Sequence, residues 1–404
     1  MIFVQLYYII NTECDEHAVI CGTPTIKQGE KDNEKIFSIV LCLVMLASLL
    51  TLASCGKKEY KIAVVTDVGT LMDKGFNQGT WEGAKAYAEA NKISYKYYQP
   101  SGGSDADDNS RVEAMQSAID NGAEIIVAPG FLQATAMRTV AKANPNVKFI
   151  FVDGWSLTDS TDDKGNDNGK PLQNVTAIVY KEEESGFLAG YAAVMEGYTK
   201  LGFTGGGGGS NPACNRFGYG FVQGAEAAAK EKNVNVTVKY SYKYGENFSA
   251  SSELQTQISG WYQNGTEVVF ACGGSMFQSV KSAAGENANA KIIGVDVDQS
   301  NESDRVITSA VKGLSVSVEK VLGQYFDGKW DAELGAKTQN LGAADDATGL
   351  PTDTWSLKNF TVDQYKAVFE KIKKGEIAPK SDVPGNANNG DWLKGFEKVT
   401  VEFE

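Results

Sequence analysis

From Tyr60 onward, short apolar and β-branched runs alternate with longer helical stretches. This alternation is typical of βαβ units on a parallel sheet, so we predict an α/β fold. In the first half we expect strands at 61–67, 94–99, 124–130, 148–154 and 175–180, with helices at 77–91, 106–121 and one ending at 144.

The same rhythm restarts near residue 182, which predicts a second lobe of like architecture with a cleft between the two. Here we expect helices at 182–196, 217–232, 250–264 and 277–285, and strands at 201–206, 235–242, 267–274 and 291–298. A strand at 306–313 and helices near 316–325 and at 362–374 come last and are expected to cross back between the lobes.

No Pro/Gly-rich linker separates the halves, which fits strands passing as crossovers better than two independent domains. We therefore assign residues 61–180 and 299–335 to an N-terminal lobe. Residues 181–298 and 336–404 are assigned to a C-terminal lobe.

An almost wholly apolar run at 36–52 is preceded by Lys31 and Lys35 and followed by Ala53-Ser54-Cys55. Positive residues, an apolar run and small residues at a cut site form a secretory signal, and the cysteine makes it a lipobox. We expect cleavage before Cys55 and acylation of its thiol, which would anchor the protein to the outer face of the bacterial cytoplasmic membrane. An ordinary transmembrane anchor is the alternative, since the run is long enough.

The N-terminal region then divides into three parts. Residues 1–30 fit no targeting pattern and are interpreted as a misassigned extension. Residues 31–54 are assigned as the lipoprotein signal peptide, and residues 55–60 as a tether.

The formal net charge is −13, and the first 54 residues hold three Lys and six Asp or Glu, which leaves 35 basic and 45 acidic residues. An acidic domain is a poor electrostatic partner for phosphate backbones, which disfavours nucleic acid and free polyphosphate as ligands.

Histidine and cysteine are scarce after the signal. His17 is the only histidine and lies before Cys55, which removes the commonest general base and most catalytic zinc sites. Besides Cys55, only Cys214 and Cys272 remain there. They are expected to be two buried thiols, with a disulfide as the alternative outside the cell.

Ligands of open parallel sheets bind at the carboxyl ends of the strands. At those ends the sequence places mostly acids and glycines: Asp67, Gly130-Phe131, Asp153, Gly205–Gly209, Gly273-Gly274 and 296–299. Carboxylates accept hydrogen bonds from neighbouring hydroxyls, and glycines let a backbone approach a flat ligand. The pattern indicates a neutral ligand that carries hydroxyl groups, such as a sugar or nucleoside, although each acid alone could be a cap or turn residue.

The densest stretch is DVGTLMDKGFNQGTWEG, at 67–83. Phe76 and Asn77 begin a helix, so Phe76 could stack on a ring and Asn77 could pair with a purine edge. A hydrophobic staple is the alternative for Phe76. Asp73 is interpreted as a loop or cap residue.

Two further stretches resemble ligand sites but do not match their motifs. The run Gly205–Gly209 lacks the GKS or GKT ending of a P-loop and is expected to be a flexible strand-to-helix turn. The acidic stretch at 159–170 does not fit the spacing of a calcium loop and is expected to be a solvated surface loop. No metal site is predicted.

Three motifs, DVG…DKGFNQGTWEG, FGYGFVQGAEAAAK and IIGVDVDQ, stand in this order after a lipobox. With them the chain resembles the basic-membrane-protein family of purine nucleoside receptor lipoproteins, over roughly residues 61–328. The resemblance implies the type I periplasmic-binding fold, two α/β lobes joined by three crossovers. It also implies a substrate-binding component of an ABC importer that closes on a nucleoside.

By motif, the resemblance carries over Asp67, Asn77 and Phe76, with Phe76 as one face of an aromatic sandwich around the base. Phe248 lies where the family places the opposing ring. The remaining matches are polar contacts to base or ribose: Asp153, Gly273, Gly274, Asp296 and Lys312. Lys312 could instead neutralise Asp296. The stretch GGGGGSNPACNRF departs from the family pattern at the cleft rim.

We therefore expect a receptor, not an enzyme, that takes a nucleoside, partners an ABC permease, needs no cofactor and acts as a monomer. A sugar or autoinducer receptor of the same fold is the first alternative. An extracytoplasmic nucleoside hydrolase is the second, because paired carboxylates can cleave glycosidic bonds. The acids here are spread over strand ends of both lobes, which favours clamping over hydrolysis.

Overall fold

A computed structural model describes residues 59–285 and 287–404. The predictions for residues 1–58, including lipidation of Cys55, lie outside the described residues. Within the described part, no helix is both long and apolar enough to cross a membrane.

The first sheet has six parallel strands in the order β11-β5-β4-β3-β1-β2. Alternate residues of each strand enter opposite faces, so that Ile62 and Val64 join one apolar cluster and Ala63 and Val65 the other. The strands are β1 (Ile62–Val65), β2 (Tyr95–Tyr98), β3 (Ile125–Pro129), β4 (Lys148–Val152), β5 (Val175–Tyr180) and β11 (Thr338–Leu341).

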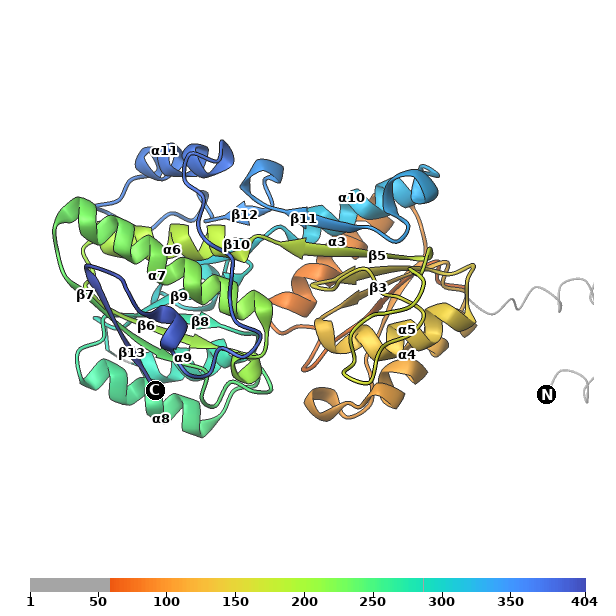
Figure 1. The fold of residues 1–404 in the computed structure, drawn as a ribbon, viewed down its shortest axis with the longest axis horizontal. Helices are drawn as coiled ribbons and strands as arrows, with labels where there is room; N and C mark the ends of the chain where they lie inside the picture. Colours follow the sequence, from red (N-terminus) through yellow and green to blue (C-terminus); the bar gives the residue numbers. More distant parts are fainter. Residues whose placement is uncertain (1–58, 286) are drawn as a thin grey trace, which may run out of the picture. The chain divides into compact units, whose positions relative to one another are not determined.

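Helices cover both faces of this sheet, as a parallel sheet requires. Helices α3 (Phe76–Asn91) and α10 (Leu314–Phe326) pack on one face. Helices α4 (Asp108–Asp120) and α5 (Ala134–Ala143) pack on the other, and Figure 1 shows both layers.

The second sheet has seven strands in the order β12-β10-β9-β8-β6-β7-β13, all parallel except the β12–β10 pair. Its strands are β6 (Lys200–Gly205), β7 (Val236–Ser241), β8 (Val268–Cys272), β9 (Lys291–Asp296), β10 (Val306–Lys312), β12 (Thr348–Gly349) and β13 (Val399–Phe403).

One face of this second sheet is covered by α6 (Glu182–Glu196) and α7 (Pro212–Lys232), with α11 (Val362–Lys373) packed beyond them. The other face is covered by α8 (Ser252–Gln263) and α9 (Met276–Ala284). The remaining short helical turns are Gly103–Asp105, Phe131–Gln133, Gly207–Gly209, Ser300–Glu302, Trp330–Leu334, Ala343–Asp345 and Asp391–Leu393.

Within residues 59–404 the chain passes between the two sheets three times, after β5, after β10 and after β11. The first turn of α6 joins these passages. Glu184 Oε2 accepts hydrogen bonds from Ala343 N at 2.6 Å and Thr348 Oγ1 at 2.8 Å, next to the third passage. Ser185 Oγ donates to Val311 O at 2.7 Å, beside the second.

Two of the expected lobe boundaries are wrong. Residues 299–335 were assigned to the first lobe, yet β10 pairs with β9 in the second sheet, and it is α10 and the turn Trp330–Leu334 that return to the first. Residues 336–404 were assigned to the second lobe, yet β11 pairs with β5 in the first sheet. An apolar strand pattern predicts a strand but not its partner, because the partner depends on the path of the connecting segments.

Two local expectations also change. Helix α7 begins at Pro212, five residues before the predicted start, because the Asn211 side chain accepts a hydrogen bond from Cys214 N at 2.9 Å and Pro212 takes the first helical position. Strands β11, β12 and β13 were not predicted, although Val399, Val401 and Phe403 of β13 alternate with polar residues.

The surface loop expected at 159–170 is held at its base by Asp167. Its Oδ1 accepts from Arg138 at 2.9 Å, and its Oδ2 accepts from Trp155 Nε1 at 2.6 Å. Among the described residues, no group of three or more His, Cys, Asp or Glu is placed to hold a metal ion.

Candidate functional site

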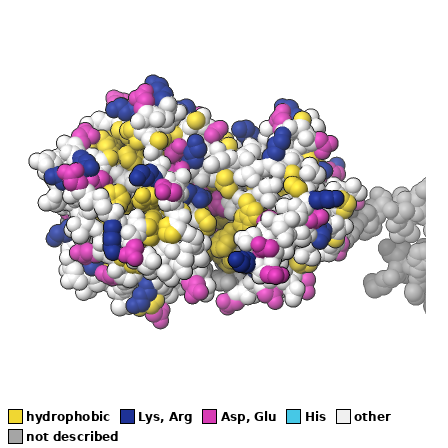
Figure 2. Space-filling view, in the orientation of Figure 1, with side chains coloured by type: hydrophobic (Ala, Val, Ile, Leu, Met, Phe, Trp, Pro, Cys, Tyr) yellow, Lys and Arg dark blue, Asp and Glu magenta, His cyan; other side chains and the backbone are white. Residues whose placement is uncertain are grey.

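A cavity of about 70 Å³, partly open to solvent, lies between the two lobes. In the space-filling view the surface is hollowed between the lobes, and hydrophobic side chains gather on both sides (Figure 2). The cavity is lined by 67–69, 73, 76, 77, 130, 131 and 153 of the first lobe, by 211, 213, 214, 217, 247, 248, 272–275, 295 and 296 of the second, and by Lys312.

The cavity wall therefore brings together every residue that the sequence proposed as a ligand contact: Asp67, Phe76, Asn77, Asp153, Phe248, Gly273, Gly274, Asp296 and Lys312. They come from seven separate segments of the chain. Their contacts with a ligand stay predictions, but their assembly at one place is a property of the fold.

Asp73 caps helix α3, as expected. Its carboxylate accepts hydrogen bonds from the backbone N–H groups of Gly75 at 2.9 Å, Asn77 at 3.0 Å and Gln78 at 3.1 Å. These bonds satisfy amides that a helix N-terminus leaves unpaired. The cap fixes the start of α3 and with it the positions of Phe76 and Asn77.

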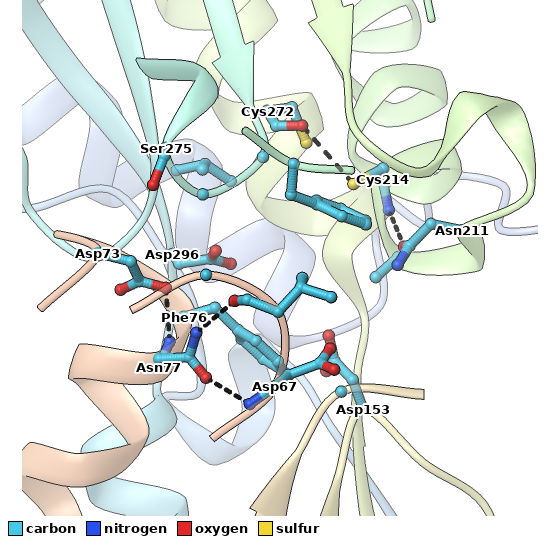
Figure 3. Close-up of a pocket in the computed structure, with 18 of the residues that line it drawn as sticks. Asp67, Asp73, Phe76, Asn77, Asp153, Asn211, Cys214, Cys272, Ser275 and Asp296 are labelled. Atoms are coloured by element: carbon cyan, nitrogen blue, oxygen red, sulfur yellow. Dashed lines mark hydrogen bonds between the residues drawn. The ribbon is translucent and has the colours of Figure 1, made fainter. Parts of the chain in front are cut away.

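Asn77 lines the cavity but already has protein partners for both ends of its amide. Its Oδ1 accepts from Asp67 N at 2.9 Å, and its Nδ2 donates to Val68 O at 3.0 Å (Figure 3). One amide hydrogen and one lone pair of Oδ1 are left over, so the donor–acceptor contact that the sequence suggested for Asn77 stays a prediction. Its main contact is with the turn that carries Asp67.

Asp67 and Asp153 lie next to each other at the first-lobe side of the cavity (Figure 3). Asp67 Oδ1 and Asp153 Oδ1 are both buried, and neither has a hydrogen-bond partner among the described residues. Burial raises the pKa of Asp67 to about 7, against the lowering effect of the Arg111 guanidinium, whose NH2 is 3.8 Å from Oδ1. A ligand donor at this point would satisfy both oxygens.

Gly130 makes room for Asp67. A Cβ at residue 130 would stand 1.9 Å from Asp67 Oδ2, and the φ angle of +94° also favours glycine. Any other residue here would displace the carboxylate from the cavity wall.

Several site residues other than glycine have backbone angles in the left-handed region. Asp153 has a φ of +56°, Phe248 of +56° and Asp296 of +66°. Such conformations are costly outside glycine and cluster at functional sites, where the surrounding structure enforces them. Here they direct side chains from strand ends and a loop into the cavity.

Lys312 lies between the lobes with its side chain 2% exposed. Its Nζ is 2.5 Å from Asp153 Oδ2, 3.3 Å from Glu182 Oε1 and 3.9 Å from Asp296 Oδ1. Lys312 thus lies within ion-pair distance of Asp296, as the alternative interpretation expected, but Asp153 is its nearest partner. These carboxylates raise the pKa of Lys312 against the effect of burial, which lowers it.

Aromatic rings and a second cation complete the surroundings of Lys312. Its Nζ lies 5.1 Å from the ring centroid of Phe76 and 5.6 Å from that of Phe217, a geometry of cation–π contact. Glu182 is also held by Arg216, whose Nε is 2.5 Å from Oε2. Burial raises the pKa of Asp296 to about 7, although Lys312 opposes the shift.

Phe248 faces the cavity from the second lobe and packs on the glycine run. A Cβ at Gly206 would stand 2.3 Å from the Phe248 ring, and one at Gly207 would stand 3.2 Å from it. The run forms the turn that we expected between β6 and α7. Its glycines also make space for the ring, which no local sequence signal indicated.

Residues that the sequence did not propose form much of the second-lobe wall. Cys214 and Cys272 are both free and buried, and Cys214 Sγ lies 3.6 Å from Cys272 O (Figure 3). The expectation of two buried thiols is confirmed, and burial raises the pKa of Cys272 well above its usual value. Asn211 lies beside them and is the cap of α7. The Asn-Pro pair could have located that cap.

Residues 60–385 match the family of PnrA-like ABC transporter substrate-binding proteins, called Bmp. The chain belongs to the Bmp family. The Bmp chain is 28% identical over 354 residues to the "ABC transporter nucleoside-binding protein BmpA" of Lactococcus lactis, which covers 80% of this chain and 93% of that protein. An "uncharacterized lipoprotein" of Pyrococcus abyssi is 25% identical over 80% of this chain and 79% of its own length.

Solved structures agree with the fold of this Bmp protein. An ABC transporter solute-binding protein from Aeropyrum pernix superposes with a TM-score of 0.64 and 20% identity, covering 80% of this chain and 94% of that one. The predicted α/β class and the two-lobed periplasmic-binding architecture are confirmed. Membership of the Bmp family makes the protein a substrate-binding component of an ABC transporter, a non-catalytic class that has a ligand and a permease as partners.

Proposed function

We propose that this Bmp protein is a lipid-anchored receptor that captures a purine nucleoside between its lobes and delivers it to an ABC importer. The observation that carries the proposal is the composition of the cavity. Phe76 and Phe248 line it from opposite lobes, and the unpartnered oxygens of Asp67 and Asp153 lie in its wall. Two rings suit a flat base, and carboxylate oxygens suit the N–H and O–H donors of a nucleoside.

The charges of the site support a ligand without phosphate groups. Asp67, Asp73, Asp153 and Asp296 line the cavity, and Lys312 is the cation among the lining residues. Lys312 is already paired with carboxylates. A phosphate would therefore face net repulsion with no free cation among the lining residues to offset it.

Calorimetry of the purified protein against inosine, guanosine and adenosine tests the proposal. At about 0.5 kcal/mol for each of roughly 19 heavy atoms, the expected free energy is on the order of −9 kcal/mol, a sub-micromolar Kd. Binding of ribose or galactose without any nucleoside would favour the sugar-receptor alternative. Release of free base, followed by chromatography, would favour the hydrolase and remove the assignment as a receptor.

The source of the ligand can be identified in the same protein. Native mass spectrometry of protein purified from its own host should show a co-purified ligand with the mass of a nucleoside. A different mass would contradict the nucleoside assignment and would identify another compound as the ligand.

The lipid anchor is proposed from the Ala53-Ser54-Cys55 motif and is supported by the lipoprotein named among the relatives. Mass spectrometry of the membrane fraction should find Cys55 as an acylated N-terminal residue. Its substitution, Cys55→Ser, should move the protein out of that fraction or leave the signal uncleaved. An unmodified, internal Cys55 in the native protein would contradict the anchor.

A further inference from the structure

Beside the cavity, the segment after β9 contacts the turn before α3 across the two lobes. Gln299 is 1% exposed, and its Nε2 donates a hydrogen bond to Lys74 O at 2.8 Å. The two residues belong to the GVDVDQ and DKGFNQ stretches, which the ligand contacts do not fully account for. A direct, partly buried hydrogen bond joins the lobes at this point.

The Gln299 side chain is held in place from its own lobe. Its Oε1 accepts from Val295 N at 3.0 Å, and its backbone N donates to Ser309 Oγ at 3.0 Å. Gly294 leaves the space it needs, since a Cβ there would stand 2.5 Å from Gln299 Oε1. The donor that faces Lys74 is therefore preorganised, with little side-chain freedom left to lose.

The acceptor side is a turn in an uncommon conformation. Lys74 has a φ of +61°, in the left-handed region, and lies between the cap residue Asp73 and Gly75. At Gly75 the lobes come close, because a Cβ there would stand 3.8 Å from Asp296 Oδ2 and 3.9 Å from Gly274 Cα. A non-glycine residue keeps such a conformation only where neighbouring contacts hold it.

A second contact between the same segments is exposed. Lys74 Nζ lies 3.6 Å from Glu302 Oε1, and the two side chains are 42% and 25% exposed. Exposed ion pairs contribute little, so the partly buried hydrogen bond from Gln299 is the stronger of the two contacts.

We propose that Gln299 is a positioning residue for ligand capture. By holding the carbonyl of Lys74, it couples closure of the second lobe to the Asp73–Asn77 turn, which presents Phe76 to the ligand. The inference rests on the proposed nucleoside receptor for its ligand but not for the contact itself. Opening the lobes breaks this bond, so its loss accelerates release more than it slows encounter.

The test compares Gln299→Met with Glu302→Gln, which removes only the exposed ion pair between the same segments. Stopped-flow measurement with inosine should show about a tenfold higher koff for Gln299→Met, the effect of losing one hydrogen bond between the lobes, with kon within about twofold of wild type. Glu302→Gln should keep both rates within about twofold. Equal koff for wild type and Gln299→Met would overturn the proposal.

Gln299→Glu is the second variant, because it keeps the acceptor for Val295 N while replacing the donor that faces Lys74. It should raise koff as Gln299→Met does, and a wild-type koff in this variant would also overturn the proposal.

Small-angle scattering without ligand separates the proposal for Gln299 from the proposal of a nucleoside ligand. If wild type binds no inosine, the nucleoside proposal fails, and a larger radius for Gln299→Met than for wild type would still support the contact. Equal radii would overturn it.

Discussion

Two buried cations lie beside two neighbouring carboxylates of the cavity, and they differ in how closely they pair with these carboxylates. Lys312 Nζ is 2.5 Å from Asp153 Oδ2 and has two further acids around it. Arg111 NH2 is 3.8 Å from Asp67 Oδ1, beyond hydrogen-bond distance, while Arg111 NH1 donates to Ala106 O at 2.8 Å. One pair is a direct contact, and the other is a weaker attraction at longer range.

The difference follows from position in the fold. Lys312 ends β10, where the chain passes between the lobes, so its ammonium balances acids of both lobes. Arg111 lies in α4 of the first lobe and is not part of the cavity wall. We infer that Lys312 chiefly stabilises the junction of the lobes, whereas Arg111 leaves Asp67 available to a ligand.

The largest effect is expected from Lys312→Met. It removes the cation from Asp153, Glu182 and Asp296, so buried charge loses its compensation, and the free energy of unfolding should fall by about 3–5 kcal/mol. Urea unfolding at neutral pH measures the change. Arg111→Met, which removes the longer-range cation, should cost less, about 1–3 kcal/mol.

A matched double variant checks the cause. Adding Asp153→Asn to Lys312→Met removes the acid nearest to the lost ammonium group and should restore part of the loss. If Arg111→Met proves as costly as Lys312→Met, the distinction between the two pairs is wrong.

Asp296 tests whether a carboxylate of the Lys312 group also binds ligand. Its contact with Lys312 is the longest of the three, which leaves it free to accept from a ribose hydroxyl. Asp296→Asn should weaken nucleoside binding by about 1.5–3 kcal/mol, the range for a hydrogen bond to a charged group. Calorimetry measures this. A variant that unfolds more easily yet binds at wild-type affinity would assign Asp296 to the turn alone.

The weakly paired carboxylate should show itself in the pH dependence of stability. The pKa of Asp67 is about 7 in the folded protein against an ordinary 3.8, so the folded state binds more protons between these values. The contribution of Asp67 to the free energy of unfolding is therefore fully present below pH 3.8 and is lost as the pH rises through about 7. Asp67→Asn should remove up to about 1.4 kcal/mol of decline in unfolding free energy per pH unit in this window.

Asp107→Asn is the control for that titration. Hydrogen bonds from Ser110 lower the pKa of Asp107, so its contribution changes only below its ordinary value of 3.8. In Asp107→Asn, the slope of the unfolding free energy against pH between pH 4 and pH 7 should stay that of wild type. A wild-type slope in Asp67→Asn as well would show that Asp67 does not titrate in this range.

The smallest effect is expected from removing one of the two aromatic rings of the cavity, Phe248 or Phe76. In Phe248→Ala, the free energy of nucleoside binding should weaken by about 0.5–1.5 kcal/mol from lost stacking, in addition to the loss from the apolar area that the ring buries. This variant should also reduce the ligand-induced compaction seen by small-angle scattering. Binding should weaken more in Phe76→Ala, because Phe76 also contacts Lys312. Wild-type affinity and compaction in Phe248→Ala would exclude that ring from the sandwich.

Local patterns located most elements and part of the cavity wall. Helix α6 lies where the pattern placed it, and strand-end residues such as Asp67, Asp153 and Asp296 do meet at one cavity. This works because parallel strands bring their carboxyl ends to one edge of a sheet, so a sequential list of ends becomes a spatial group. The start of α7 was misplaced because the Asn211 cap and Pro212 were not recognised.

The sequence by itself therefore determined the α/β class, the family, the order of most elements and part of the cavity wall. Only the tertiary structure decided that β10 belongs to the second sheet and β11 to the first. It also decided that Asp153 is the nearest partner of Lys312 and that Gln299 forms a hydrogen bond with Lys74. Elements form from periodicity within a short segment. Pairings between residues far apart along the chain depend on how the lobes pack, which local periodicity does not encode.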